Sequence, residues 1–83
     1  MELQGKVAVI TGGSGGIGQA MAKAFLAQGA RAVVLADLSE AAVKAAAAAL
    51  GCEGYACNVT DEAQVHALVE KVLADHGQID LFC

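Results

Sequence analysis

Glycines crowd into one short segment near the start of the chain. Five of the seven residues from 12 to 18 are glycine, and this segment directly follows a β-branched run over residues 6–11. After it, apolar residues over 17–28 recur at the spacing of one helix face. Glycine has no Cβ and reaches positive φ, so it suits a tight turn into a helix whose amide groups face an anion. A buried strand that leads at once into a helix favours α/β folds.

The same alternation continues to the end of the chain. Short apolar runs predict strands, and apolar residues three and four apart predict helices. Strands are expected over residues 6–11, 32–36, 54–57 and 79–83, and helices over 17–28, 41–50 and between Thr60 and Gly77. Each connection is long enough for a right-handed parallel crossover. We therefore expect an α/β fold, the first half (β-α-β-α-β-α-β) of a Rossmann-type doubly wound parallel sheet.

No linker divides residues 1–83, which we expect to be the N-terminal part of a single larger domain. Ser39 and Thr60 are the expected N-caps of the second and third helices. Ala20 and Ala24 are expected to bring the first helix close to the sheet. The expected apolar stripe of that helix consists of Ile17, Met21, Ala24 and Phe25.

Charge and cysteine content exclude some classes of function. The chain has 5 Lys and Arg against 9 Asp and Glu, which argues against a nucleic-acid partner because clustered basic residues supply most of that affinity. It has no basic start before an apolar stretch and no apolar run of the roughly 20 residues that span a bilayer, so no membrane partner is expected. Three cysteines without a framework spacing predict a reducing, cytoplasmic location.

An acidic residue stands where a dinucleotide-binding fold needs one. Asp37 ends the second expected strand, 19 residues after Gly18, and its carboxylate can accept hydrogen bonds from ribose hydroxyls and repel a 2′-phosphate. Neither position 15 nor position 38 is basic, so NAD is preferred over NADP. The structural alternatives are a glycine turn without a ligand and an aspartate that only ends a strand before Ser39.

Three motifs together resemble the N-terminal part of the short-chain dehydrogenase/reductase family. Thr11-Gly12-x-x-x-Gly16-x-Gly18 matches the family's cofactor loop, although Gly13-x-Gly15-x-x-Gly18 also fits the ordinary dinucleotide fingerprint. Asn58-Val59 stands where the family usually has Asp and an aliphatic residue that hold the adenine ring. Residues 77–83 resemble the stretch that leads into the family's Asn-Asn-Ala-Gly motif. The resemblance covers the whole chain.

The resemblance implies an NAD-dependent oxidoreductase that transfers a hydride between nicotinamide and a small alcohol or carbonyl substrate, as a homo-oligomer when complete. Asn58 replaces the usual aspartate, and its amide oxygen is expected to accept from the adenine amino group. The residues expected to bind the cofactor are Gly12, Ser14, Gly15, Gly16, Ile17, Gly18, Asp37, Leu38, Asn58 and Val59.

No catalytic residue is expected within the chain. The family's catalytic Ser and Tyr-x-x-x-Lys lie beyond position 83, and the single tyrosine, Tyr55, has Val59 four residues later. We therefore expect the 83 residues alone to show no turnover. We also expect them to be poorly stable or self-associating, because a fourth strand at the terminus would leave an apolar edge.

Other functions have weaker support. A non-catalytic dinucleotide-binding module fits the same motifs, whereas the loop spacing counts against an S-adenosylmethionine methyltransferase. A metal site is not expected, because the spacing of the candidate ligands is not of a zinc type. Those candidates are Cys52, Cys57, His66 and His76. Cys57 and Cys83 are instead expected to be small apolar strand residues, and Asp80 a structural residue.

Overall fold

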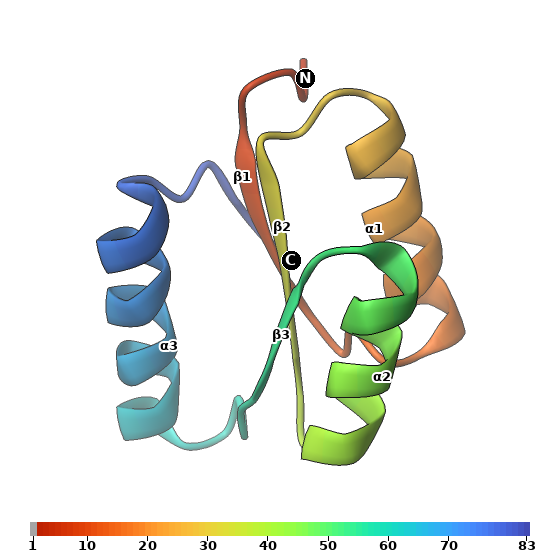
Figure 1. Ribbon diagram of the computed structural model, residues 1–83. Helices are drawn as coiled ribbons and strands as arrows, with labels where there is room; N and C mark the ends of the chain where they lie inside the picture. The colour runs from red at the N-terminus through yellow and green to blue at the C-terminus, as the bar shows by residue number, and fades with distance from the viewer. Residues whose placement is uncertain (1) are drawn as a thin grey trace.

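Four parallel strands and three helices alternate along the chain in the computed structural model, which describes residues 2–83 (Figure 1). The strands are β1 (Val7–Thr11), β2 (Ala32–Asp37), β3 (Glu53–Ala56) and β4 (Leu81–Phe82). The helices are α1 (Gly16–Ala27), α2 (Glu40–Leu50) and α3 (Glu62–His76). The sheet order is β3-β2-β1-β4, and every neighbouring pair is parallel. This Rossmann-like arrangement confirms the predicted fold class and element order, although β4 is shorter than expected.

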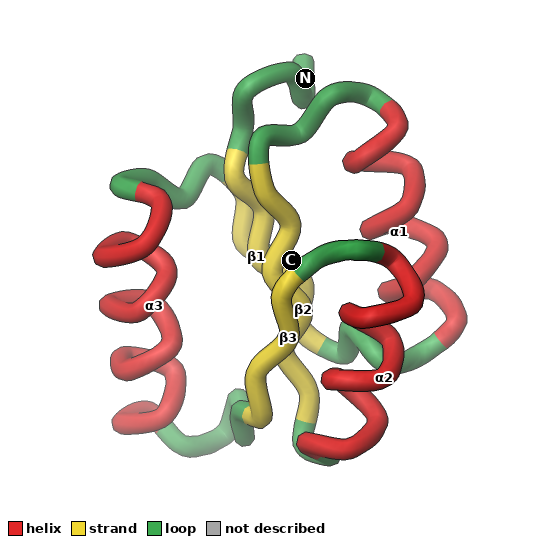
Figure 2. Tube along the Cα trace, viewed as in Figure 1, coloured by secondary structure: helices red, strands yellow, loops and turns green. Residues whose placement is uncertain are grey.

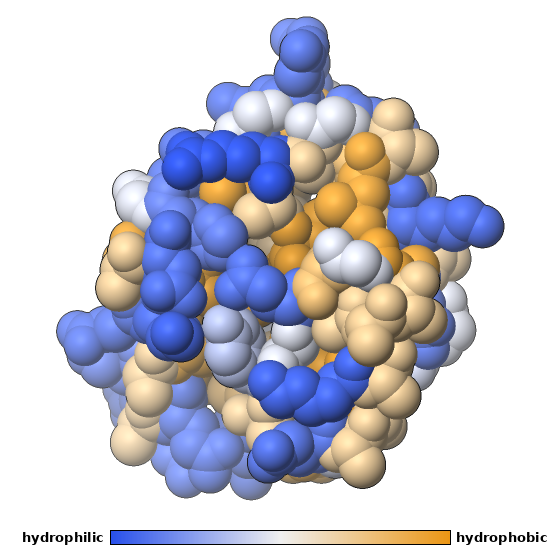
Figure 3. Space-filling model, viewed as in Figure 1, coloured by the Kyte–Doolittle hydropathy of each residue, from blue (hydrophilic) through white to orange (hydrophobic). Residues whose placement is uncertain are grey.

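The sheet lies between two helical layers, with α1 and α2 on one face and α3 on the other (Figure 2). Successive strand residues point to opposite faces, so β2 supplies both cores. Val33 and Leu35 pack toward α1 and α2, whereas Val34 and Ala36 pack toward α3. Figure 3 shows apolar side chains gathered beside α1, next to the core that contains Val33 and Leu35. Coverage on both faces explains why the β1 and β2 sequences are almost continuously apolar.

The face that α1 presents to the sheet matches the predicted stripe only in part, because Met21 and Phe25 pack against the core as predicted but the rest of the stripe does not. The buried residues of α1 are Gly18 and Ala22, one turn apart, whereas Ile17 is 82% exposed and Ala20 and Ala24 are also exposed. The close approach to the sheet that was expected from Ala20 and Ala24 is therefore made by the face that carries Gly18 and Ala22. The helix is rotated because the small residues at 18 and 22 let it pack against the glycine loop and the strands beneath.

The cap of α2 was predicted correctly, and that of α3 was not. Ser39 Oγ accepts from the Ala42 amide at 3.2 Å. At α3 the cap is Asp61 rather than Thr60, and its carboxylate accepts from the Ala63 amide at 3.0 Å. The Asp61 carboxylate also accepts from the next amide along the helix. A hydroxyl offers less to these amide groups than a carboxylate, and the Thr60 hydroxyl is used elsewhere in the preceding turn.

The two cysteines that were expected to be strand residues each lie just after a strand. Cys57 is buried but follows β3, and Cys83 is exposed and follows β4, so neither is the strand residue that was predicted. His76, in the last turn of α3, places Nε2 2.5 Å from Glu53 Oε2. Asp80 is structural as expected, because its Oδ2 accepts from the Val7 amide at 2.8 Å and so joins the approach to β4 to β1.

Candidate functional site

Three loops that carry the predicted site residues meet at one edge of the sheet. Parallel strands all end at the same edge, which is the lower one in Figure 1. The glycine loop follows β1. Asp37 is the last residue of β2, the middle strand of the three, and Leu38 comes next. Asn58 and Val59 lie in the loop after β3. The order β3-β2-β1 places these loops in a row. The Cys57 amide donates to the Asp37 carbonyl at 2.8 Å, which holds the second and third loops together.

Three of the loop glycines are required by the fold itself. Gly12 has φ of 68°, a conformation that L side chains rarely adopt. A Cβ on Gly13 would lie 2.7 Å from Leu35 Cβ, and one on Gly18 would lie 2.5 Å from the Gly12 carbonyl oxygen. The loop is folded so tightly against α1 and β2 that no side chain fits at Gly13 or Gly18, whereas Gly12 is required by its backbone conformation.

The remaining two loop glycines have no such requirement. A Cβ on Gly16 would meet nothing within 4 Å, and one on Gly15 would make only an ordinary contact of 3.5 Å with the Gly12 carbonyl oxygen. Gly15 has φ of −78° and ψ of 165°, which any residue can adopt. Both residues are exposed. The space beside them is open to an external group.

The start of α1 offers amide groups to that space. Its N-cap is Gly15, which has no side chain to accept from the first turn. Within residues 2–83, no acceptor faces the amide groups of Gly16, Ile17 and Gly18. Unpaired amides and the positive end of the helix dipole together favour an anion. The geometry therefore fits a phosphate group, and the exposed Ile17 side chain flanks the same turn.

Ser14 is held from two sides. Its carbonyl oxygen accepts from Gln19 Nε2 at 2.7 Å, which ties the loop to the first turn of α1. Its amide donates to Asp37 Oδ2 at 3.1 Å, and its hydroxyl donates to the same oxygen. No pattern in the sequence indicates the role of Gln19, because a glutamine in a first helical turn is ordinarily a solvated residue.

Asp37 carries its charge beside the glycine loop. Besides the two bonds from Ser14, its Oδ1 accepts from the Leu38 amide at 2.8 Å. The Ser14 hydroxyl, and after it the Leu38 amide, lower the pKa of Asp37, which outweighs the opposing effect of partial burial. A carboxylate has about four lone-pair positions, so one on Oδ1 is left for a further donor. Asp37 is therefore ionised near neutral pH.

The loop after β3 is a tight turn centred on Asn58. Its Oδ1 accepts from the Thr60 amide at 3.0 Å and from the Thr60 hydroxyl at 2.7 Å. The oxygen expected to meet an adenine amino group is thus already engaged within the turn. Two apolar side chains stay exposed beside this turn, Leu38 at 71% and Val59 at 53%.

The threonine of the glycine motif joins the last strand to the site. Thr11 donates to the carbonyl oxygen of Cys83 through its amide at 2.8 Å and through its hydroxyl at 2.6 Å. The Thr11 side chain therefore fixes where the chain leaves β4, and it lies at the same edge as the glycine loop.

A sequence model of the family described as short chain dehydrogenase matches residues 6–83. The chain belongs to the short-chain dehydrogenase family. It is 41% identical over 83 residues to (+)-cis,cis-nepetalactol synthase NEPS3 of Nepeta racemosa, covering 96% of this chain and 31% of that protein. It is 42% identical over 86 residues to the mitochondrial (-)-isopiperitenol/(-)-carveol dehydrogenase of Mentha piperita, covering 99% of this chain and 32% of that protein.

Solved structures of the short-chain dehydrogenase family share the same fold. A short chain dehydrogenase/reductase from Burkholderia phymatum, in complex with NAD, superimposes with a TM-score of 0.91 at 38% identity. The match covers 99% of this chain and 31% of that one. The chain thus spans about a third of the length of the curated relatives it matches.

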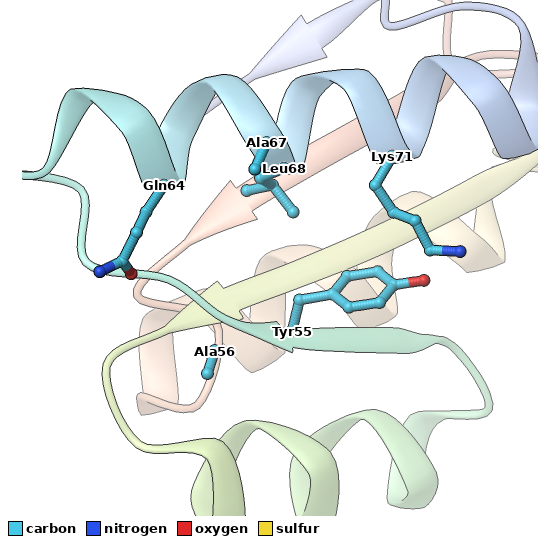
Figure 4. A pocket seen from close by; sticks show the side chains of 6 residues that line it. All are labelled: Tyr55, Ala56, Gln64, Ala67, Leu68 and Lys71. Atoms are coloured by element: carbon cyan, nitrogen blue, oxygen red, sulfur yellow. The ribbon is translucent and has the colours of Figure 1, made fainter.

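A largely apolar hollow between β3 and α3 borders the third loop at one end, where Gln64 Oε1 accepts from the Asn58 amide at 2.9 Å. It has a volume of about 220 Å³, and Figure 4 shows the Tyr55 ring at one end beside Lys71, with Gln64 at the other end.

Among residues 2–83, no cluster of His, Cys, Asp and Glu could hold a metal ion. No helix within the described part of the chain has the length and apolar content to cross a bilayer.

Proposed function

We propose that this chain binds NAD along the row of three loops, as the cofactor-binding part of a short-chain dehydrogenase. The glycine loop holds the pyrophosphate, Asp37 holds the adenosine ribose, and the turn after β3 holds the base. The proposed binding residues are those predicted from the sequence, namely Gly12, Ser14, Gly15, Gly16, Ile17, Gly18, Asp37, Leu38, Asn58 and Val59.

The open space beside Gly15 and Gly16 is the observation that carries this proposal. A glycine that neither the packing nor the backbone conformation requires only raises the conformational entropy of the unfolded chain, which lowers stability. Its presence therefore indicates another role, such as leaving room for a ligand. A phosphate seated on the free amides of the first α1 turn would fill this space and exclude a side chain from it. Gly12, Gly13 and Gly18 shape the loop but do not by themselves argue for a ligand.

The charge of Asp37 supports a preference for NAD. Its remaining lone-pair position can accept from one ribose hydroxyl without breaking the bonds from Ser14 and Leu38. A 2′-phosphate at the same place would meet a carboxylate whose pKa is lowered, and it would be repelled. The relative from Burkholderia phymatum that was solved with NAD supports the same cofactor.

The exposed apolar side chains suit the base. Leu38 and Val59 leave 71% and 53% of their surface uncovered, and they follow β2 and β3, which are neighbours in the sheet. A purine ring packed against them would remove apolar surface from water at both positions. In the whole protein, NAD held here would supply hydride transfer to or from an alcohol or carbonyl substrate, and this chain's residues would bind and orient the dinucleotide.

Titration calorimetry of the protein with NAD tests the proposal. We expect binding that is competed by ADP-ribose, because the proposed contacts lie on the adenosine and pyrophosphate. In Gly16→Val, a branched side chain would occupy the phosphate space and abolish binding. Ala49→Val, an exposed site on α2 away from this edge, is the matched control and should bind as the unaltered protein does. Absence of NAD binding to the folded, unaltered protein would refute the proposal.

A further inference from the structure

Asn58 has one hydrogen-bonding group left unused. Its Oδ1 accepts two bonds from Thr60, which fills both lone pairs of an amide oxygen. Since a backbone amide can only donate, the contact from the Thr60 amide fixes which end of the side chain is oxygen. The main chain of Asn58 is also paired, to Gln64 Oε1 at 2.9 Å and to the Asp61 amide at 2.9 Å. Of the polar groups of Asn58, only Nδ2 has no hydrogen-bond partner among residues 2–83, and this atom is not buried.

The residue after Asn58 carries a second unused donor. The Val59 amide has no acceptor among the described residues 2–83. The turn after β3 therefore offers two unused donors, Asn58 Nδ2 and the Val59 amide, and no unused side-chain acceptor from Asn58. The exposed side chains of Leu38 and Val59, on this loop and the one beside it, supply apolar surface.

Strand order decides which part of a dinucleotide reaches this turn. The phosphate space follows β1, the carboxylate of Asp37 follows β2, and the turn with Asn58 follows β3, the next strand along. Phosphate, ribose and base succeed one another in the same order along one half of a dinucleotide. The base is thus the part that meets Asn58 and Val59.

We propose that Asn58 makes this a donor-lined base site, which recognises position 6 of a purine as an acceptor and takes a 6-oxopurine dinucleotide at least as well as NAD. This inference rests on the proposed function. Adenine presents an amino group beside its N1 or N7 acceptor, so it satisfies one of the two donors and sets an amino group against the other. Hypoxanthine presents O6 beside N7, and both are acceptors.

Calorimetry with NAD and with nicotinamide hypoxanthine dinucleotide tests this inference. The two ligands carry the same charge and share every other group, so the ratio of their affinities reports the base contact alone. The unaltered protein should bind the hypoxanthine dinucleotide as tightly as NAD or more tightly. In Asn58→Asp, one carboxylate oxygen keeps the bonds from Thr60 while the other replaces Nδ2 with an acceptor. The ratio should then shift toward NAD by about tenfold, the size of one charge-assisted hydrogen bond.

Asp61→Asn is the matched control, because it changes the charge of the same loop, keeps a good N-cap and leaves Asn58 Nδ2 in place. Its ratio should equal that of the unaltered protein, and circular dichroism checks that both variants fold. A tenfold preference of the unaltered protein for NAD, or an unchanged ratio in Asn58→Asp, would overturn the inference and leave the proposed function standing. Failure of the unaltered protein to bind either dinucleotide would overturn both.

Discussion

Asp37 Oδ2 accepts hydrogen bonds from both the amide and the hydroxyl of Ser14, and the amide nitrogen lies 3.1 Å away. The contact joins the end of β2 to the middle of the glycine loop, across 23 positions of sequence. It fixes a negative charge beside the loop, and it also orients Ser14. Loop geometry and the charge that faces the proposed ribose are therefore coupled.

The charge of Asp37 should set the choice between NAD and NADP. In Asp37→Ser, loss of the repulsion toward a 2′-phosphate should narrow the preference for NAD by about tenfold, or roughly 1.4 kcal/mol. Ser14→Ala removes the hydroxyl contact but keeps the amide contact and the charge, so it should retain the preference. Calorimetric affinities for both dinucleotides check this. Equal binding of NAD and NADP by the unaltered protein would show that Asp37 does not have this role.

Two glycines of the loop should respond differently to valine. Gly16→Val should keep the fold and lose dinucleotide binding, because valine is a slightly better helix former than glycine and a Cβ at this position meets nothing within 4 Å. Gly18→Val should lower the free energy of unfolding by about 1–3 kcal/mol, because its Cβ would press on the Gly12 carbonyl oxygen. Urea denaturation followed by circular dichroism separates the two. A Gly18→Val protein as stable as the unaltered one would contradict the packing described for the loop.

Acid should destabilise the fold through two aspartates. The Val7 amide, and after it the Gln78 side chain, lower the pKa of Asp80 below its ordinary value of 3.8. The pKa of Asp37 is lowered as well. A carboxyl whose folded pKa is lowered contributes stability that is complete above 3.8 and is lost as pH falls through the folded value.

The contribution of these two aspartates to the free energy of unfolding should therefore be complete above about pH 5 and be lost below about pH 4. Asp80→Asn should make the acid limb shallower and should lower stability at pH 7, because the charge on Asp80 strengthens the bond from the Val7 amide. Urea denaturation at a series of pH values measures both effects. An acid limb of the same steepness in Asp80→Asn would exclude Asp80 as a source of it.

The single tyrosine should ionise late. Burial, and after it the hydrogen bond to Glu53, raise the pKa of Tyr55 to about 12. The hydroxyl donates to Glu53 Oε1 at 3.0 Å, and the chain has no tryptophan, so absorbance at 295 nm reports this group alone. The folded protein should titrate near 12, and Glu53→Gln should bring the midpoint closer to the ordinary value of 10.

The sign of the effect on stability is the reverse of that for the aspartates. A group with a raised pKa contributes stability that is complete below pH 10 and is lost as pH rises toward 12. In strong urea the tyrosine of the unfolded chain should titrate near its ordinary value, which is the control. Identical midpoints in the folded and unfolded protein would show that Tyr55 lacks these contacts.

The sequence by itself determined the order of strands and helices, the parallel architecture and most helix ends. These features depend on residues near one another in the chain. Apolar periodicity distinguishes strand from helix, and Gly51 and Gly77 end their helices in the left-handed conformation that glycine adopts readily. Ser39 caps α2 through an amide three residues away. The predicted N-cap of α3 was wrong because Thr60 and Asp61 are both suitable cap residues. The contact of the Thr60 hydroxyl with Asn58 within the turn decided between them.

Only the tertiary structure decided what each residue of the site is free to do. Gly13 is required by Leu35 on another strand, whereas Gly16 faces open space, and no local pattern separates the two. The face of α1 that is buried follows from how closely Gly18 packs on the loop, not from the apolar stripe alone. Asp37 meets Ser14 because β1 and β2 are neighbours in the sheet. Such contacts depend on the packing of segments far apart in the chain, which local sequence signals do not encode.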